Sequence, residues 1–390
     1  MRPVRRSVPF VLLVIGCGAR SSLDLLDASV VTPTVDASLV TPDAPVAARL
    51  HVASLALGWD HACAILSDKT ARCWGENDTA QLGVSSSLEQ SDQAIALTSP
   101  TGIAAMSGGY DQTCAVLVDG TLECWGSNNV GESGAGMTAA TIPPTVIASG
   151  YTSAGAGFDY GCGARTDGTV WCWGASDHDQ TGSLGYSRVP VEVAGVQGAA
   201  FVSVGEYVSC ALLMQGSVRC WGLGPLGDGS LTDSALPVQV AVVASSVTQL
   251  AVGGMHACAL LEDKSIACWG YGGYGELGLG TSVDTAPEPR TVPGLGPAVS
   301  VSSCDLHSCA ALQDGTVSCW GNDTAYTPGT FSPATVAGVA GATAVASGDS
   351  FDCALLASGK VVCWGDNGAG QLGDGTTTPS ATPVLVLGLP

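Results

Sequence analysis

The sequence has few charged residues and very few basic ones. Charged residues make up 12% of the 390 residues, and 34 acidic residues against 13 basic ones give a net charge of −21. Beyond the first six residues, no cluster of lysine or arginine offsets this charge locally. Because a nucleic-acid backbone would be repelled by such a field, we predict that the chain does not bind nucleic acid.

Helical periodicity and long apolar runs are also missing. The apolar run at residues 8–15 is too short to span a bilayer as a helix. What the sequence does have is 53 glycines and 46% hydrophobic residues, with aromatic residues that recur regularly. This composition excludes a disordered chain and favours a turn-rich β protein.

The N-terminus carries an export signal. Three arginines within residues 2–6 precede the apolar run, and Leu13–Cys17 resembles the bacterial lipobox, in which the cysteine is acylated. An ordinary signal peptide that contains a cysteine is the alternative. We predict a lipoprotein signal peptide at 1–16 and lipidation of Cys17, which anchors the chain to a membrane without crossing it.

Residues 17–49 are rich in Pro, Thr, Asp, Val and Ala and sustain no strand or helix period. We interpret them as the lipid anchor followed by a flexible linker. Gly18 is not the Asp that commonly retains lipoproteins at the inner membrane, so the cell envelope, and within it the outer membrane, is the expected location. The folded domain is predicted to be residues 50–390.

Tryptophan followed by glycine recurs along this domain at intervals of 51, 48, 48, 48, 51 and 44 residues, at Trp74, Trp125, Trp173, Trp221, Trp269, Trp320 and Trp364. A period of this length is typical of a propeller or solenoid. Each unit contains about four short strand patterns separated by turn residues. Since one four-stranded sheet cannot bury both apolar faces alone, the sequence predicts an all-β fold, a seven-bladed β-propeller.

Fourteen of the sixteen cysteines form seven pairs with the same separation: Cys63 with Cys73, Cys114 with Cys124, Cys162 with Cys172, Cys210 with Cys220, Cys258 with Cys268, Cys309 with Cys319, and Cys353 with Cys363. A three-residue turn such as Val118–Gly120 lies midway in each pair. A hairpin on this turn puts the two cysteines directly opposite, at a non-hydrogen-bonded site where side chains are closest. This spacing suits a disulfide in every blade. Zinc is the alternative, but the pairs lack further ligands at constant offsets.

Two cysteines remain after this pairing. Cys17 is assigned to the lipid. Cys304 replaces a glycine that the other six units carry before the second strand of each blade. It is either a small buried substitute or an accessible thiol, and we favour the buried position.

Segments Gly58–Ala64, Gly253–Leu260 and Val361–Gly373 resemble the repeat of the regulator-of-chromosome-condensation family, which forms seven-bladed propellers. The resemblance runs from about residue 50 to the C-terminus. Its nuclear member is an exchange factor for a small GTPase, which an exported chain could not reach. Other propellers of this kind are exported bacterial proteins that bind partner proteins, including an inhibitor of β-lactamase. The resemblance therefore implies the fold more firmly than the function.

Catalytic and metal-binding motifs are not found in the sequence, and we predict no metal, no cofactor and no catalytic residue. His61, His256 and His307 share one repeat position, two residues before the first cysteine of a blade. A position repeated around a ring indicates a structural role rather than a ligand.

One asymmetry points to a surface. After the turn glycine, the first three blades carry an aromatic residue and an aspartate, namely Trp59, Asp60, Tyr110, Asp111, Phe158 and Asp159. We predict an aromatic and acidic binding patch on one face. The alternative is that these aromatics only pack between blades.

The sequence thus favours a monomeric, non-catalytic cell-envelope scaffold that binds a protein or an envelope glycan. The alternative is an enzyme that modifies envelope glycans with carboxylates on one propeller face. Paired carboxylates converging over the axis would favour the enzyme, whereas a broad uncharged aromatic patch would favour binding.

Overall fold

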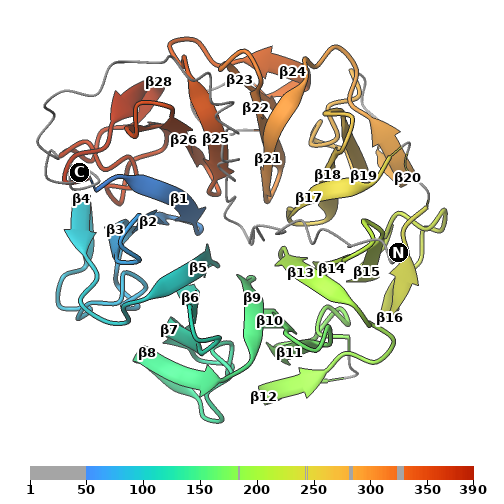
Figure 1. Ribbon diagram of the computed structural model, residues 1–390, viewed down its shortest axis with the longest axis horizontal. Coiled ribbons are helices and arrows are strands. Elements are labelled where there is room, and N and C mark those ends of the chain that lie inside the picture. Colours follow the sequence, from blue (N-terminus) through green and yellow to red (C-terminus); the bar gives the residue numbers. More distant parts are fainter. Residues whose placement is uncertain (1–49, 183–184, 242, 244, 281–283, 323–328) are drawn as a thin grey trace, which may run out of the picture.

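The computed structural model describes residues 50–390 apart from 183–184, 242, 244, 281–283 and 323–328. It shows seven four-stranded antiparallel sheets arranged around a central axis (Figure 1). The predicted all-β, seven-bladed propeller is therefore confirmed. The signal peptide, Cys17 and the linker lie outside the described residues. Within the described part of the chain, no helix is long and apolar enough to cross a membrane.

Each blade is built from four consecutive strands. The first strands lie next to the axis and are β1 (Val52–Leu57), β5 (Ile103–Gly108), β9 (Tyr151–Ala156), β13 (Ala199–Val204), β17 (Val247–Val252), β21 (Ala298–Cys304) and β25 (Ala342–Ser347). The second strands are β2 (His61–Leu66), β6 (Gln112–Leu117), β10 (Tyr160–Arg165), β14 (Val208–Leu213), β18 (His256–Leu261), β22 (His307–Leu312) and β26 (Phe351–Leu356).

The third strands end in the Cys-Trp-Gly motif or just after it. They are β3 (Ala71–Glu76), β7 (Leu122–Asn128), β11 (Val170–Gly174), β15 (Val218–Gly222), β19 (Ile266–Tyr271), β23 (Val317–Gly321) and β27 (Val361–Gly365). The fourth strands form the outer rim: β4 (Gln90–Ala96), β8 (Ala139–Ala148), β12 (Ser187–Glu192), β16 (Ser234–Gln239), β20 (Thr285–Thr291), β24 (Thr330–Thr335) and β28 (Ser380–Leu385).

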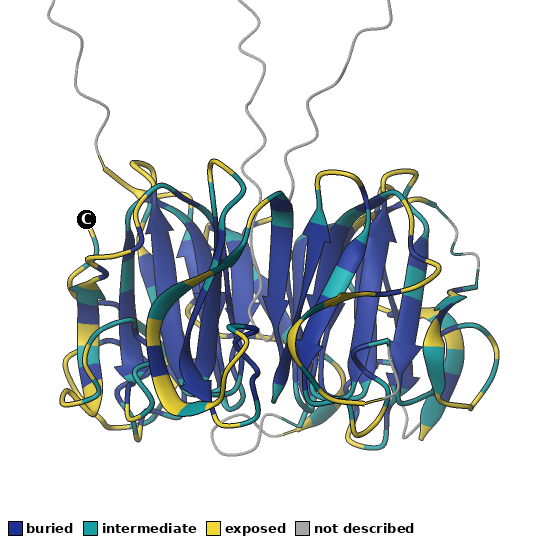
Figure 2. Cartoon of the chain, turned by 90° about the horizontal axis from the view of Figure 1, so that it is seen from below, coloured by how far each residue is buried: buried dark blue, intermediate teal, exposed yellow. Residues whose placement is uncertain are grey.

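Burial follows the position of a strand in its blade. The second strands are buried along almost their whole length, because both faces of the sheet are covered by neighbouring blades. The fourth strands contain many exposed residues, so the outer rim and the loops are the parts of the domain that face solvent (Figure 2). This explains why apolar residues run nearly without interruption in the second strand of each repeat.

The central hairpin of each blade has the predicted register. In the second blade, Leu117 pairs with Thr121 at the loop, and Cys114 lies opposite Cys124. Gly120 has a φ of 83°, and the two units without this glycine have Lys69 and Lys264 at φ values of 69° and 71°. The left-handed position of the turn is therefore kept even where its residue is not glycine.

All seven expected disulfides are present, with Cα atoms 4.0–4.1 Å apart. This close approach is typical of the non-hydrogen-bonded pairs of an antiparallel ladder. Cys304 is buried and lies outside the seven bridges. Both predictions, the pairing and the buried position of Cys304, are confirmed. The bridges join Cys63 to Cys73, Cys114 to Cys124, Cys162 to Cys172, Cys210 to Cys220, Cys258 to Cys268, Cys309 to Cys319 and Cys353 to Cys363.

The disulfides predict a simple labelling pattern. In the folded domain purified without reductant, we expect none of the fourteen paired cysteines to react with a maleimide, because each sulfur is bonded in a disulfide. Denaturation alone should expose only Cys304, and denaturation with reductant should add fourteen labels, counted by intact mass. Labelling of more than one thiol of the domain before reduction would contradict the pairing.

The repeated tryptophan contacts the loop between the third and fourth strands of the preceding blade. Five of the seven indole N–H groups donate to a loop carbonyl at 2.8–2.9 Å, in Trp74, Trp125, Trp173, Trp221 and Trp320. The following loop glycine lies against the same ring. At Gly134, with a φ of 79°, a Cβ would come within 2.9 Å of Trp173. The loop between the third and fourth strands of one blade therefore holds the tryptophan of the next blade in place.

The ring closes between the first and last blades without exchange of a strand. Trp74 donates to the carbonyl of Gln371 at 2.9 Å, and the amide of Asp349 donates to the carbonyl of Trp59 at 3.1 Å. Every blade is therefore a continuous piece of chain, and the same contacts that join other neighbours also close the circle.

The propeller has two faces with different connections. We call the face with the turns between first and second strands the axial-turn face, and it also carries the loops between third and fourth strands. The opposite face carries the turns between second and third strands, and we call it the hairpin face. The carbonyl of His51 accepts a hydrogen bond from Ser67 in the first hairpin. The chain therefore enters the domain on the hairpin face.

Candidate functional site

A ring of seven residues, one per blade, surrounds the axis on the axial-turn face. Each member follows the turn glycine, or Cys304 in the sixth blade, and we call the set the axial ring: Trp59, Tyr110, Phe158, Glu206, Gly254, Asp305 and Asp349. Backbone hydrogen bonds tie neighbouring turns together, including those from Trp59 to Gly109 and from Gly254 to Asp305. The ring is therefore held by the blades themselves.

The three aromatic members pack against each other across blade boundaries. The ring centroids of Trp59 and Tyr110, and of Tyr110 and Phe158, are each 4.5 Å apart, and those of Trp59 and Phe158 are 6.3 Å apart. All three side chains remain half-buried. The structure thus brings the predicted aromatic residues into one partly exposed cluster, and it also shows the contact between blades that was the alternative.

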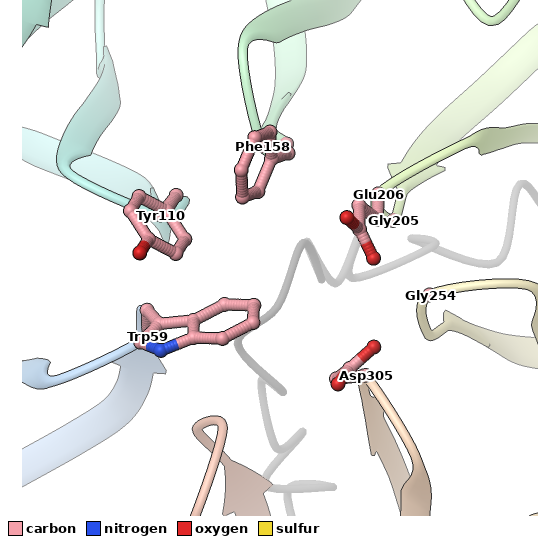
Figure 3. Close-up of a pocket in the computed structure, with 8 residues that line it drawn as sticks. Trp59, Tyr110, Phe158, Gly205, Glu206, Gly254 and Asp305 are labelled. Carbon is pink, nitrogen blue, oxygen red and sulfur yellow. The ribbon is translucent and has the colours of Figure 1, made fainter. Parts of the chain in front are cut away.

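The other half of the axial ring is acidic. A small pocket on the axis is bounded by the aromatic cluster on one side and by Glu206, Gly254 and Asp305 on the other. Figure 3 shows the indole of Trp59 reaching toward the axis, with the two carboxylates facing it from the opposite blades. Gly254 leaves space for its neighbour, because a Cβ there would lie 2.6 Å from the Asp305 carboxylate.

Carboxylates on this face ionise with difficulty. Burial first, and then repulsion by neighbouring carboxylates, raise the pKa of six acids: to about 7 for Asp60, Glu76, Asp111 and Glu276, and to about 6 for Asp159 and Asp305. Asp60, Asp111 and Asp159 are the predicted patch aspartates. The face therefore gains negative charge as the pH rises through 6 and 7.

Basic residues do not neutralise this charge. No lysine or arginine occurs in any axial turn or in any loop between a third and a fourth strand. Lys69, Lys264 and Lys360 lie in the hairpin turns of the opposite face. The surface around the axis is thus acidic and aromatic, not the broad uncharged patch that would mark binding alone, and its two pocket carboxylates do converge on the axis.

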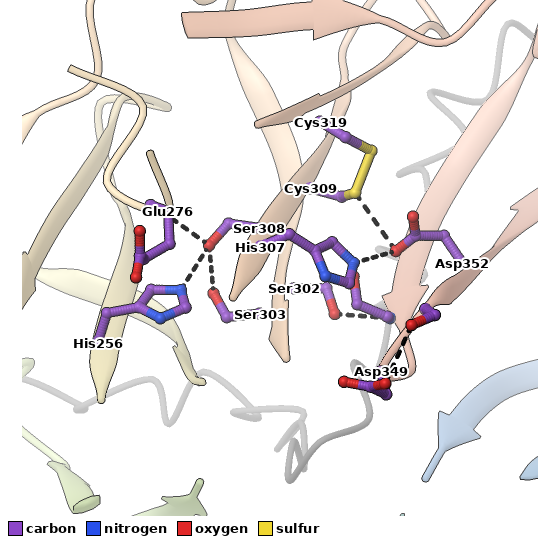
Figure 4. Close-up of polar contacts among 12 residues, drawn as sticks. His256, Glu276, Ser302, Ser303, His307, Ser308, Cys309, Cys319, Asp349 and Asp352 are labelled. Carbon is purple, nitrogen blue, oxygen red and sulfur yellow. Dashed lines mark hydrogen bonds and ion pairs between the residues drawn. A yellow bond between two sulfur atoms is a disulfide. The ribbon is translucent and has the colours of Figure 1, made fainter. Parts of the chain in front are cut away.

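The repeated histidines hold blades together. His61 Nε2 lies 2.8 Å from Thr113 Oγ1 of the next blade, and His256 Nε2 lies 2.8 Å from Ser308 Oγ (Figure 4 shows the second of these). Burial lowers the pKa of His61 to about 4 and that of His256 to about 3. Both rings are therefore neutral, and the predicted structural role of this position is supported by its contacts.

Two groups of side chains have the spacing of metal ligands. His307, Cys309 and Asp352 are buried together, but the sulfur of Cys309 is in a disulfide and offers no thiolate. Glu76, Asp78 and Asp111 place carboxylate oxygens within 4.8 Å of one another. Carboxylates of this kind bind hard cations, and acidic surfaces also bring them together without one.

Glu206, Gly254 and Asp305 were missed when the binding residues were predicted from the sequence. They occupy the same repeat position as Trp59 and could have been found by reading that position around the whole ring. Glu76 and Glu276 were missed as well. Their signal is weaker, because they lie in or near loops whose path around the axis only the folded blades define.

The chain was compared with known proteins. The family model described as the regulator of chromosome condensation (RCC1) repeat matches residues 52–81, 247–276 and 342–371, and a second RCC1 repeat model matches 267–311. No curated protein matches the sequence. The similarity is thus carried by individual repeats in the first, fifth, sixth and last blades.

Solved structures show the same architecture at low sequence identity. Human WBSCR16 is 18% identical with a TM-score of 0.74, over 81% of this chain and 93% of that one. Yeast RCC1 (Prp20), solved with Kap60, is 19% identical with a TM-score of 0.68, over 77% and 79%. The ectodomain of the Arabidopsis thaliana receptor kinase ACR4 is 21% identical with a TM-score of 0.51, over 81% and 96%. At these identities the likeness concerns the fold: the chain forms a seven-bladed propeller, and segments of four of its blades match the RCC1 repeat models.

Proposed function

We propose that this chain is a non-catalytic, protein-binding scaffold of the cell envelope, attached to a membrane through lipid on Cys17. The observation that carries the proposal is the axial ring, where a half-exposed aromatic cluster faces an acidic arc on a rigid support. Aromatic residues that remain partly exposed on a rigid surface are typical of binding sites. The Prp20 structure is named for its complex with Kap60, which supports partner binding by analogy of fold.

The geometry of attachment supports the same proposal. The linker joins the domain at the hairpin face, next to Ser67. The axial turns lie at the other end of first strands that are six residues long, or about 20 Å away. The first described residues of the domain therefore lie at the face opposite the axial ring. Seven disulfides fit an exported protein, since such bridges persist in oxidising compartments.

The test is partner retention after cross-linking in intact cells. We expect the variant Trp59→Ala, Tyr110→Ala, Phe158→Ala to lose the partner while keeping the fold. A matched control replaces Val118 and Met214, which are 66% and 64% exposed, by alanine on the hairpin face. Retention by the first variant equal to that of the control would discard the proposal. Cys17→Ser should move the protein from the membrane fraction to the soluble fraction.

An enzyme acting on envelope glycans is the second candidate, because Glu206 and Asp305 both border the axial pocket and burial raises the pKa of Asp305 to about 6. A carboxyl group that stays partly protonated near neutral pH can serve as a general acid. Release of reducing ends from envelope glycan, lost in Glu206→Gln and in Asp305→Asn, would establish this activity. If the unmodified protein shows no turnover of envelope glycan, the enzyme is excluded and the scaffold remains the proposed function.

A further inference from the structure

We propose that the axial pocket binds one lysine side chain of the partner, with its ammonium group between the Trp59 ring and the carboxylates of Glu206 and Asp305. This inference rests on the proposed protein-binding function and names the group that the scaffold recognises. Four properties of the pocket support it: its charge, its aromatic wall, its size and its glycine.

The acidic side chains of the pocket indicate that its ligand is a cation. Glu206 and Asp305 border the same pocket, and the charge of Glu206 is one of the causes that raise the pKa of Asp305, after burial and the charge of Asp349. No basic side chain occurs in the turns and loops of this face. A cation placed between these carboxylates would relieve their mutual repulsion, whereas an anion would increase it.

The aromatic wall selects an organic cation on an apolar stem. A cation within about 6 Å of an aromatic ring centroid is attracted by the negative face of the ring, and tryptophan is the most effective residue. Tyr110 and Phe158 continue the wall around the axis, with their ring centroids 4.5 Å apart. The four methylene groups of a lysine can lie along these rings while the ammonium group reaches the acids.

The small volume of the pocket favours lysine over larger cationic groups. The centres of water-sized groups can occupy about 10 Å³ of the pocket, within about 240 Å³ of empty space that includes open solvent. The smaller volume is about what one water-sized group requires. An ammonium group has this size, whereas a planar guanidinium or a trimethylammonium group is larger. The pocket should therefore prefer lysine to arginine.

Gly254 keeps the pocket open. It is the single member of the axial ring without a side chain, and its added Cβ would lie 2.6 Å from Asp305 Oδ1. The amide of Gly254 also donates to the carbonyl of Asp305 at 3.1 Å, which fixes the turn beside the pocket. A larger residue here would displace the carboxylate that the ammonium group needs.

The experiment measures binding of n-butylammonium, a mimic of the lysine side chain, to the full chain. The indole resonance of Trp59, assigned by its loss in Trp59→Phe, should shift in a saturable way. We expect n-butylguanidinium and tetramethylammonium to bind about tenfold more weakly. Equal affinity for all three cations, or no saturable shift with n-butylammonium, would overturn the inference.

Variants assign the effect to the pocket. Glu206→Gln with Asp305→Asn should weaken n-butylammonium binding at least about tenfold, and Gly254→Ala should do the same. Asp68→Asn with Asp119→Asn removes two charges from hairpin turns of the opposite face and serves as the control. Because the double variant of the pocket removes repulsion, its fold is not at risk, and unchanged binding in it would overturn the inference even if Gly254→Ala fails to fold.

The outcome is distinguishable from failure of the proposed function. If partner retention depends on the aromatic cluster but is unaffected by Glu206→Gln with Asp305→Asn, the scaffold stands and the lysine pocket is wrong. If retention is lost in the double variant and is also competed by n-butylammonium, both stand. Retention that no axial-ring variant changes would discard the proposed binding surface itself.

Discussion

Replacing Asp352 by alanine should lower the free energy of unfolding by about 3–5 kcal/mol, because it breaks a buried contact between a histidine and a carboxylate across a blade boundary. His307 Nε2 and Asp352 Oδ1 are 3.1 Å apart, and the two side chains are 1% and 0% exposed. They join β22 of the sixth blade to β26 of the seventh (Figure 4). Chemical denaturation of the two proteins measures the difference.

The cost arises from the broken contact and not from the net strength of the pair. Burying an imidazole and a carboxyl group away from water is unfavourable, and their mutual contact roughly compensates for it. The fourth and fifth blades have Val208 and Ala257 at the two equivalent positions, both buried. The double variant His307→Val, Asp352→Ala copies that natural boundary, and we expect it to recover most of the lost stability.

Two further results complete the test. Asp352→Asn keeps the volume and one acceptor oxygen, so it should cost less than Asp352→Ala. A double variant as unstable as Asp352→Ala would show that the loss comes from the cavity at Asp352 and not from the broken contact with His307. In that case this contact would not be what stabilises the blade boundary.

The repeat made the fold predictable. Seven cysteine pairs of identical separation and seven recurring tryptophans define blade number, strand order and register, because one hairpin is repeated seven times. The role of Trp125 was less evident, although its position was known. Its indole donates to the carbonyl of Gln81 in the preceding blade, and a contact between units is not visible in the pattern of one unit.

The candidate site was predictable only where it follows the repeat. Trp59, Tyr110 and Phe158 share a repeat position, so the sequence could group them before their contact was known. Their acidic counterparts Glu206 and Asp305 occupy the same position, but what makes them a pocket is closure of the ring, which brings the fourth and sixth blades to the same pocket as the first three. Which side chains face each other across the axis depends on the number of blades. Gly254 contributes because it leaves space for the Asp305 carboxylate.

The second prediction concerns pH. The free energy of unfolding should fall as the pH rises from 6 to 8, by about 3 kcal/mol if folding takes up about one proton on average over this range. Six carboxyl groups on the axial-turn face have a pKa raised to about 6 or 7: Asp60, Glu76, Asp111, Asp159, Glu276 and Asp305. Several are partly exposed, so solvent screening keeps the effect well below the sum of their separate shifts.

The sign follows from where the protons are bound. In the unfolded chain these carboxyls lose their protons near pH 4, whereas in the folded chain they keep them to about pH 6 or 7. Their contribution is therefore fully present below pH 4 and is lost as the pH rises through the folded values. His61 and His256 act in the opposite direction, because burial lowers their pKa to about 4 and about 3. Their contribution is complete above the unfolded pKa of about 6.5 and is lost as the pH falls below it. Their opposing effect therefore fades as the pH rises above 6.5, while that of the carboxyls persists.

A matched pair of variants separates this cause from net charge. Glu76→Gln with Asp111→Asn should flatten the slope between pH 6 and 8, since it removes two of the raised groups. Asp68→Asn with Asp119→Asn removes the same charge from hairpin turns, where hydrogen bonds from Thr70 and Thr121 lower the pKa of each carboxyl. These two carboxyls are already ionised above pH 6 in both states, so the slope should persist in that variant. A slope equal in the two variants would mean that overall charge, and not the crowded acids around the axis, sets the pH dependence. A bound ammonium group should reduce the slope as well, because it favours the ionised carboxylates that the empty pocket disfavours.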